Sequence, residues 1–166
     1  MILAVDVDYS DDEGHAAGVL FREWEDPEAE RAVTAKIAPI HEYIPGQFYK
    51  RELPCIMELL ELIHEPLSCI VVDGYVYLGT DEKPGLGKYL YDELKGSIPV
   101  IGVAKSSFVD TPPNCEVLRG GSTRPLYVTA AGIDKDIAKS HIKSMHGEFR
   151  FPTLLKEVDA LCRNWK

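Results

Sequence analysis

The first 40 residues alternate between apolar and polar segments in a way that predicts three consecutive strands. Met1–Tyr9 opens on a continuous apolar run and then alternates, as a strand does when one face becomes exposed. His15–Trp24 and Arg31–Ile40 are two further strand-like segments, and short polar turns separate the three. Because strands joined by short turns pair antiparallel, we expect a three-stranded meander.

Helices and strands alternate in the rest of the chain. Ile56, Leu59, Leu60 and Ile63 follow the i, i+3, i+4, i+7 spacing of one helix face. The same pattern predicts helices near Leu86–Lys95, Asp134–Met145 and Pro152–Trp165. Continuous apolar runs predict buried strands at Cys69–Gly74 and Pro99–Val103, and a late hairpin at Glu116–Leu118 and Leu126–Thr129. Since parallel strands need crossover helices, this part of the chain favours parallel pairing.

This order of elements predicts a mixed α/β sheet with helices on both faces, built as one domain over residues 1–166. The ribonuclease-H-like fold has this order, three antiparallel strands and then strand–helix alternation, although other mixed α/β layouts also fit. A chain of 166 residues that is 45% apolar can bury a substantial core. No apolar run approaches the roughly 18 residues of a membrane span, and the N-terminus lacks the basic flank of a secretory signal. We therefore expect a soluble cytoplasmic protein.

Charge is distributed unevenly. Residues 1–80 carry 5 Lys and Arg against 16 Asp and Glu, a net charge of −11, whereas residues 81–166 carry 13 against 11, a net charge of +2. The resulting −9 does not favour generic phosphate binding, so a polyanionic substrate would require metal ions and local cations. Clustered carboxylates are the ligands of such hard cations. The four cysteines form no Cys-x-x-Cys motif, and we expect buried free thiols.

Two acidic residues interrupt otherwise apolar strands. Asp6 follows a run of apolar residues, and Asp73 closes the strand that begins at Cys69. A carboxylate next to a buried strand is costly unless it is paired or binds a cation. If the two strands are neighbours, both carboxylates lie at the end of the sheet where α/β proteins place their sites. A strand-end acid that caps a loop or opens a turn is the alternative for each.

Four other features have both a functional and a structural interpretation. Glu52 lies near the start of a helix, where an acid also favours the helix dipole. Asp159 lies beside the apolar face of the last helix and either leans into a site or is solvated. Lys105 follows a buried strand. It either binds an anion or simply extends its ammonium into water. Tyr43-Ile44-Pro45-Gly46 is a stiff loop that either plugs the core or forms an apolar wedge between bases.

Six segments occur in a specific order along the chain. They are Ala4-Val5-Asp6-Val7-Asp8-Tyr9, Tyr43-Ile44-Pro45-Gly46 running into Arg51-Glu52-Leu53-Pro54, Val72-Asp73-Gly74, Ile101-Gly102-Val103-Ala104-Lys105-Ser106, Pro125-Leu126-Tyr127-Val128, and Arg150-Phe151-Pro152 closing on Asp159. Taken together they closely resemble the endonuclease V family over essentially the whole chain. The second and fourth segments are the most diagnostic.

The resemblance implies a ribonuclease-H-like fold and a Mg²⁺- or Mn²⁺-dependent endonuclease. Such an enzyme recognises deoxyinosine, or in some members inosine in RNA, hydrolyses a phosphodiester on its 3′ side, and serves the repair of deaminated bases. The resemblance makes Asp6, Glu52, Asp73 and Asp159 the metal carboxylates, and it places Lys105 at the reacting phosphate or its attacking water. It also implies a substrate-binding set, with Tyr43, Ile44 and Pro45 as the wedge and Gly46, Phe48, Gly74, Gly85 and Leu86 around the base.

One segment departs from the family pattern. After Asp73 and Gly74 the family usually has a second glycine and a His-Pro-Arg stretch, whereas Val76 stands at the glycine here and the stretch is absent. Tyr89 replaces a usual histidine in the following helix. Two alternatives therefore stay open: a nucleic-acid-binding module of the same fold without inosine cleavage, or a nuclease for another modified or branched substrate. The expected partner is inosine-containing DNA or RNA, with a monomer favoured and no membrane association.

Overall fold

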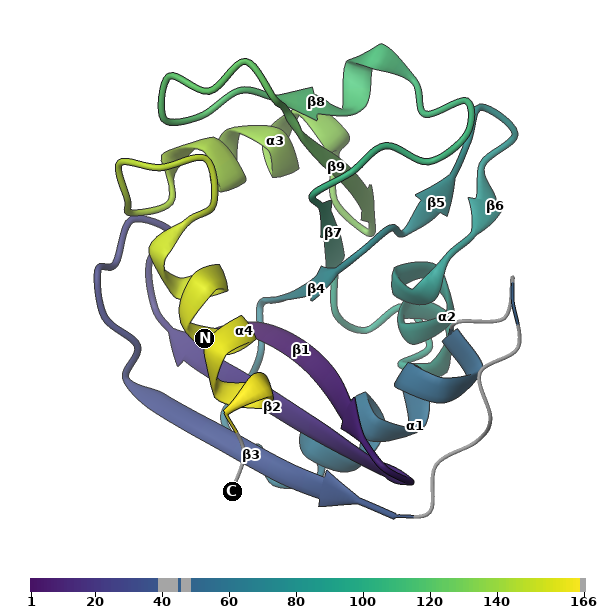
Figure 1. The fold of residues 1–166 in the computed structure, drawn as a ribbon, viewed down its shortest axis with the longest axis vertical. Helices are drawn as coiled ribbons and strands as arrows, with labels where there is room; N and C mark the ends of the chain where they lie inside the picture. The colour runs from purple at the N-terminus through teal and green to yellow at the C-terminus, as the bar shows by residue number, and fades with distance from the viewer. Residues whose placement is uncertain (39–44, 46–48, 165–166) are drawn as a thin grey trace.

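The computed structural model describes residues 1–38, 45 and 49–164, and within them one seven-stranded sheet has the order β3-β2-β1-β4-β7-β9-β8 (Figure 1). Its strands are β1 (Ile2–Ser10), β2 (Glu13–Phe21), β3 (Arg31–Ile37), β4 (Cys69–Asp73), β7 (Val100–Ala104), β8 (Glu116–Val117) and β9 (Leu126–Ala131). A separate two-stranded ribbon joins β5 (Tyr77–Leu78) and β6 (Lys83–Pro84). The described residues also form the helices α1 (Tyr49–Leu60), α2 (Leu86–Glu93), α3 (Lys135–Ser144) and α4 (Thr153–Arg163), and the short 3₁₀ helix η1 (Pro113–Cys115).

Strand pairing confirms the predicted meander and the predicted parallel half. β1 pairs antiparallel with β2 over its whole length, and β2 pairs antiparallel with β3. β1 then pairs in parallel with β4, and β4 with β7, because α1 and α2 supply the crossovers. The late hairpin is also confirmed, because β8 pairs antiparallel with β9. β9 in turn pairs antiparallel with β7. The result is the mixed sheet that the sequence predicts.

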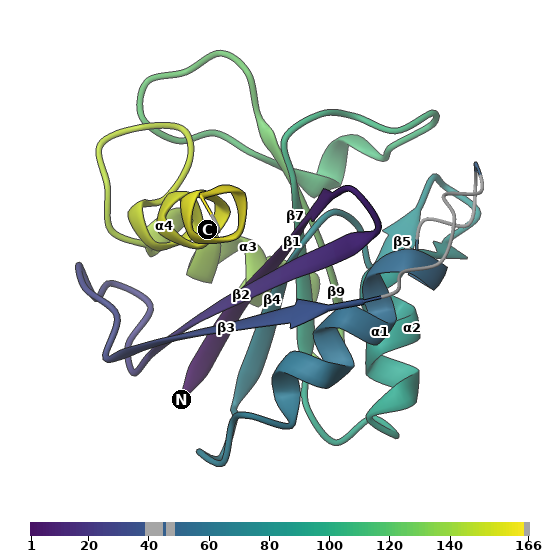
Figure 2. The same cartoon turned by 60° about the horizontal axis from the view of Figure 1, so that its bottom comes forward.

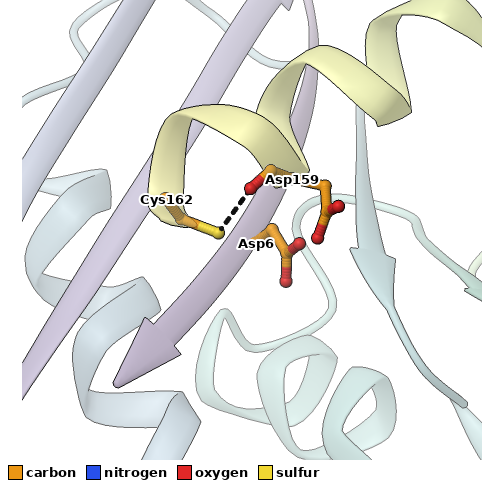
Figure 3. A group of neighbouring side chains, drawn as sticks. All are labelled: Asp6, Asp159 and Cys162. Carbon is orange, nitrogen blue, oxygen red and sulfur yellow. Dashed lines mark hydrogen bonds between the residues drawn. The ribbon is translucent and has the colours of Figure 1, made fainter. Parts of the chain in front are cut away.

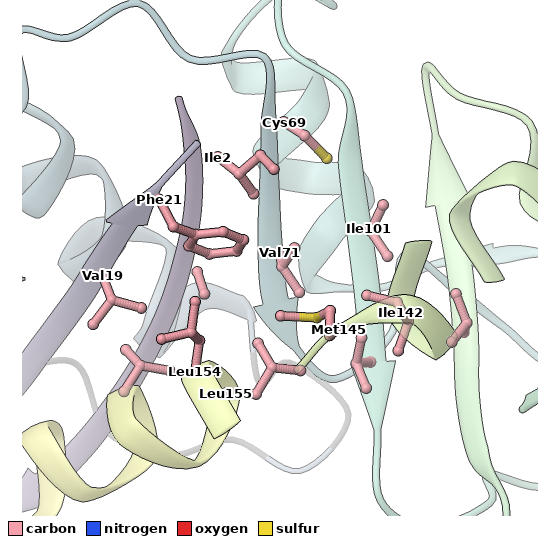
Figure 4. Close-up of a cluster of buried hydrophobic side chains, with 14 of the residues drawn as sticks. Ile2, Val19, Phe21, Cys69, Val71, Ile101, Ile142, Met145, Leu154 and Leu155 are labelled. Carbon is pink, nitrogen blue, oxygen red and sulfur yellow. The ribbon is translucent and has the colours of Figure 1, made fainter. Parts of the chain in front are cut away.

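Two helices cover each face of the sheet, as Figure 2 shows. On the face covered by α3 and α4, Phe21 and Val71 pack against Leu154 and Ile142 (Figure 4). On the other face, α1 and α2 cover a second core cluster that includes Leu3, Val5, Ile56, Leu59, Ile70 and Leu90. Successive β1 side chains alternate between the clusters, as the two-residue period of a strand requires.

The structure differs from the sequence expectations in small elements. The turn expected at residues 10–14 is shorter, because β1 continues to Ser10 and β2 begins at Glu13. The β5–β6 ribbon and η1 were not predicted, since segments of two or three residues carry no readable periodicity. All four cysteines are buried and free, as expected. Within the described ranges, no helix is long and apolar enough to cross a membrane.

Candidate active site

Asp6 and Asp73 occupy matching positions on neighbouring parallel strands. Val5 pairs with Val72, so each aspartate is the next residue toward the carboxyl end of its strand, where the β1–β4 pairing stops. The two-residue alternation places both side chains on the face of Ala4, which is the face covered by α3 and α4. The strands are therefore neighbours, and the two acids lie at one edge of the sheet.

Helix α4 brings a third carboxylate to this edge. A possible ligand atom of Asp6 lies within 4.8 Å of one from Asp159 and one from Cys162, and these two also lie within 4.8 Å of each other. Figure 3 shows the three side chains next to one another. The Cys162 thiol donates to the Asp159 carbonyl at 3.2 Å, and Arg163 Nε donates to Asp159 Oδ1 at 2.9 Å. From the sequence, Cys162 was expected only as a buried thiol. Its i, i+3 spacing from Asp159 on a helix was the one signal of its place here.

Glu52 approaches from the first turn of α1 and is only 7% exposed. Burial raises its pKa well above the usual value, and the charges of Asp6 and Asp73 raise it further. An acid that merely favours the helix dipole would be solvated, whereas this one is buried toward two other acids. Its oxygens and those of Asp73 lie outside the 4.8 Å group formed by Asp6, Asp159 and Cys162.

The carboxylates raise one another's pKa. Burial, the charge of Asp73 and a hydrogen bond with Asp159 raise the pKa of Asp6 to about 7, although the Val7 N–H donates to its Oδ1 at 2.9 Å. Asp73 is exposed at the end of β4, yet protein around its carboxyl still removes hydration and raises its pKa. Lys105 lowers that pKa and Asp159 raises it. Converging carboxylates of this kind are the oxygen donors that a hard divalent cation takes.

Lys105 lies beside these acids on the next strand. It directly follows β7, whose Val103 pairs with Asp73, and its ammonium lies 4.4 Å from the centroid of the Phe151 ring. A small hollow whose lining includes Asp6, Asp73, Val103 and Phe151 connects the acids with this ring. The structure therefore places the Lys105 ammonium and an aromatic ring next to the acidic cluster.

The expected substrate-binding residues fall into two groups. Tyr43, Ile44, Gly46 and Phe48 lie outside the described residues, and Pro45 is exposed in a turn. Gly74 has a positive φ of 118° with open space where a side chain would be, and its N–H donates to the Val103 carbonyl at 2.9 Å. Gly85 and Leu86 are buried, and Leu86 belongs to the core cluster under α1 and α2.

Val76, the main departure from the family pattern, is fully buried and packs toward α2. A side chain on Gly87 would come within 2.6 Å of Val76 Cγ2, so the absence of one at position 87 makes room for the valine. The Val76 N–H donates to Thr129 Oγ1 at 2.8 Å. The other replaced residue, Tyr89, stacks on Tyr49 at 3.7 Å between ring centroids, which joins α2 to α1.

Comparison with known proteins agrees with this geometry. The family model for endonuclease V matches residues 1–138. The chain belongs to the endonuclease V family. Endonuclease V of Streptomyces coelicolor is 30% identical over 142 residues, which cover 73% of this chain and 59% of that relative. The protein from Streptomyces avermitilis is 28% identical over 185 aligned positions, covering 98% of this chain and 79% of the relative.

Solved structures show the same fold. The crystal structure of Streptomyces avermitilis endonuclease V has a TM-score of 0.78 and 29% identity, covering 98% of this chain and 79% of that one. Endonuclease V of Ciona intestinalis, in complex with a 24mer DNA containing an inosine followed by a ribo-adenosine, has a TM-score of 0.74 and 17% identity, with 98% and 83% covered. These neighbours confirm the predicted ribonuclease-H-like fold.

Proposed function

We propose that this endonuclease V family member is a divalent-metal-dependent endonuclease that hydrolyses a phosphodiester on the 3′ side of deoxyinosine or inosine. The observation that carries the proposal is the convergence of Asp6, Glu52, Asp73 and Asp159, from four separate elements, at one edge of the sheet. The inosine-containing DNA bound to the Ciona relative supports the substrate class. The chain spans 59% of the length of its Streptomyces coelicolor relative.

The four carboxylates would hold Mg²⁺ or Mn²⁺. Their fit to such an ion rests on charge: Asp6, Glu52 and Asp73 each have a raised pKa because acids are held close together with reduced hydration. A bound divalent ion supplies a nucleophilic water at neutral pH and stabilises charge on the phosphate oxygens.

The protein's own cations would orient the substrate and the acids. Lys105 offers an ammonium beside Asp73 for an oxygen of the reacting phosphate, and the Phe151 ring holds that ammonium. Arg163 fixes the Asp159 carboxylate from the next turn of α4. These two side chains place positive charge next to the acids in an otherwise acidic protein.

Access to the modified base would require its extrusion from the strand. This extrusion costs a few kcal/mol, and the cost is lowest for a mispaired base. We assign the wedge to Tyr43, Ile44 and Pro45. The base would be held by Gly46, Phe48, Gly74, Gly85 and Leu86. Because the Gly74 N–H is already bonded to Val103, Gly74 would contribute open space and not a hydrogen-bond donor.

Val76, one of the departures that left two alternative functions open, does not itself favour them. A binding module without cleavage, or a nuclease for another substrate, was suggested by the segment after Gly74 as a whole, which has valine at position 76 and lacks the His-Pro-Arg stretch. Since Val76 is buried against Gly87, its side chain does not extend into the open space beside Gly74. The acids that would hold the metal ion are all present.

The test is Mn²⁺-dependent nicking of oligonucleotides that carry one inosine, compared with matched adenosine controls, in DNA and in RNA. We expect a metal-dependent nick 3′ to inosine that Asp73→Asn removes. Asp92→Asn is the matched control, because Asp92 pairs with Lys88 on the surface of α2. Equal nicking of the adenosine strand, or full activity in Asp73→Asn, would contradict the proposal.

A further inference from the structure

We propose that Arg150 is a positioning residue that holds Lys105 in place beside the acidic cluster. The inference rests on the proposed function, which gives Lys105 its contact with the reacting phosphate. Arg150 itself touches no acid of the cluster among the described residues, and its contacts are with backbone carbonyl groups. Its effect on the reaction would therefore pass through Lys105.

The Arg150 guanidinium joins two strand ends at the point where their pairing stops. Nη2 donates to the carbonyls of Lys105 and Pro125, the latter at 2.7 Å, and Nε donates to the Arg124 carbonyl at 2.9 Å. The last pair between β7 and β9 is Ala104 with Tyr127, so Lys105 lies one residue beyond the sheet hydrogen bonds. Beyond the sheet, Arg150 bonds the Lys105 carbonyl, and the Tyr75 hydroxyl donates to the next carbonyl, that of Ser106, at 2.7 Å.

The next residue holds the Lys105 side chain. The Phe151 ring lies under the Lys105 ammonium at 4.4 Å and also lines the hollow with Asp6 and Asp73. Pro152 follows and caps α4, the helix that carries Asp159. Three consecutive residues thus act on the site: Arg150 bonds the Lys105 backbone, Phe151 contacts its ammonium, and Pro152 begins the helix that carries Asp159.

This segment is itself firmly held. Arg119 is only 7% exposed and donates to the carbonyls of Met145 at 2.5 Å, Phe149 at 2.8 Å and Arg150 at 3.2 Å. Gly120 packs so closely that a side chain there would come within 2.5 Å of the Phe149 carbonyl carbon. These contacts hold the loop before Arg150 against the rest of the protein. The position of the Arg150 side chain is therefore constrained.

The planar fork of arginine suits this position. Its fixed donors reach carbonyls on both strand ends at once, whereas a lysine ammonium is a compact group on a flexible stem. Arg150→Lys would keep the positive charge and lose this bridging, and Arg150→Gln would lose both. The two variants separate a requirement for geometry from one for charge.

The kinetic test is a double-mutant cycle on single-turnover nicking of the inosine strand. We expect Arg150→Lys and Arg150→Gln to lower the rate by about 100-fold at most, the scale for small misplacement of a reacting group. In a Lys105→Ala background, either Arg150 variant should cost nothing further. Arg31→Gln is the matched control, because Arg31 binds Glu65 through a similar fork at a distant surface. Additive losses would overturn the proposal.

A second readout does not depend on activity. When lysine amines carry ¹³C-methyl groups, the Phe151 ring shifts the NMR signal of Lys105, which is assigned by its loss in Lys105→Ala. We expect Arg150→Gln to move this signal toward its position in Phe151→Leu, while Arg31→Gln leaves it unchanged. An unmoved signal would overturn the positioning role. If the wild-type protein fails to nick inosine strands, the proposed function fails, and the NMR signal still decides the role of Arg150.

Discussion

Asp6→Asn should stabilise the metal-free protein above neutral pH. Burial and the nearby Asp73 and Asp159 raise the pKa of Asp6 from 3.8 to about 7. Between these values the native state keeps a proton that the unfolded chain has released, so stability falls as pH rises, and the loss is complete above the folded-state pKa. A shift of about 3 pKa units at about 1.4 kcal/mol each gives about 4 kcal/mol as an upper value. Solvent at the partly exposed carboxylate reduces it.

Urea unfolding in EDTA at pH 4 and at pH 8 measures this difference. Wild-type stability should decrease between the two values by more than that of Asp6→Asn, because the asparagine carries no charge to bring into the cluster. Asp92→Asn, on the surface of α2, should follow the wild-type pH dependence. Added Mn²⁺ should stabilise the wild type at pH 8 more than the variant, since ligand binding to the native state adds to its stability. Parallel pH dependences in wild type and Asp6→Asn would refute the electrostatic argument.

Three further outcomes follow from the same geometry. Glu52→Gln should lower metal-dependent nicking by about 100-fold or more while the circular dichroism spectrum stays that of the wild type; unchanged nicking would remove Glu52 from the site. Binding of an inosine duplex in Mn²⁺, followed by fluorescence anisotropy, should weaken as salt rises from about 50 to 200 mM, and a flat profile would argue against phosphate contacts. Gly87→Ala should destabilise the fold by about 1–3 kcal/mol in urea, and Val76→Ala should restore part of it; no restoration would show that the two positions do not share one space.

Much of the fold could be predicted because its strands and helices are long enough to show a period. Parallel pairing in the second half followed from its apolar runs and intervening helices. The pairing of β1 with β4 was only a condition at the sequence level, and the structure meets it and so brings Asp6 and Asp73 together. These two acids stood out because each adjoins a buried strand, where a charge needs a partner. The short β5–β6 ribbon was missed, since Tyr77–Leu78 and Lys83–Pro84 are too brief to carry a pattern.

The rest of the site depends on tertiary contacts that no local pattern contains. Glu52 occupies a first helical turn like many solvated acids, and only the packing of α1 against the sheet shows that it is buried. Asp159 and Cys162 share one side of α4, but their proximity to Asp6 depends on how that helix crosses β1. For Glu52 and Asp159 the family resemblance supplied what periodicity could not, whereas it assigned no role to Cys162.

Both halves of the unevenly charged chain contribute charged side chains to this edge of the sheet. The acidic first half supplies Asp6, Glu52 and Asp73, while the second half supplies Asp159 together with Lys105 and Arg163. With all four carboxylates ionised, as metal binding requires, their charge of −4 against Lys105 and Arg163 leaves −2, which one divalent ion would neutralise. Attraction to the substrate would thus depend on the bound metal more than on the net charge of −9. Chelation should therefore weaken binding even where the salt concentration is low.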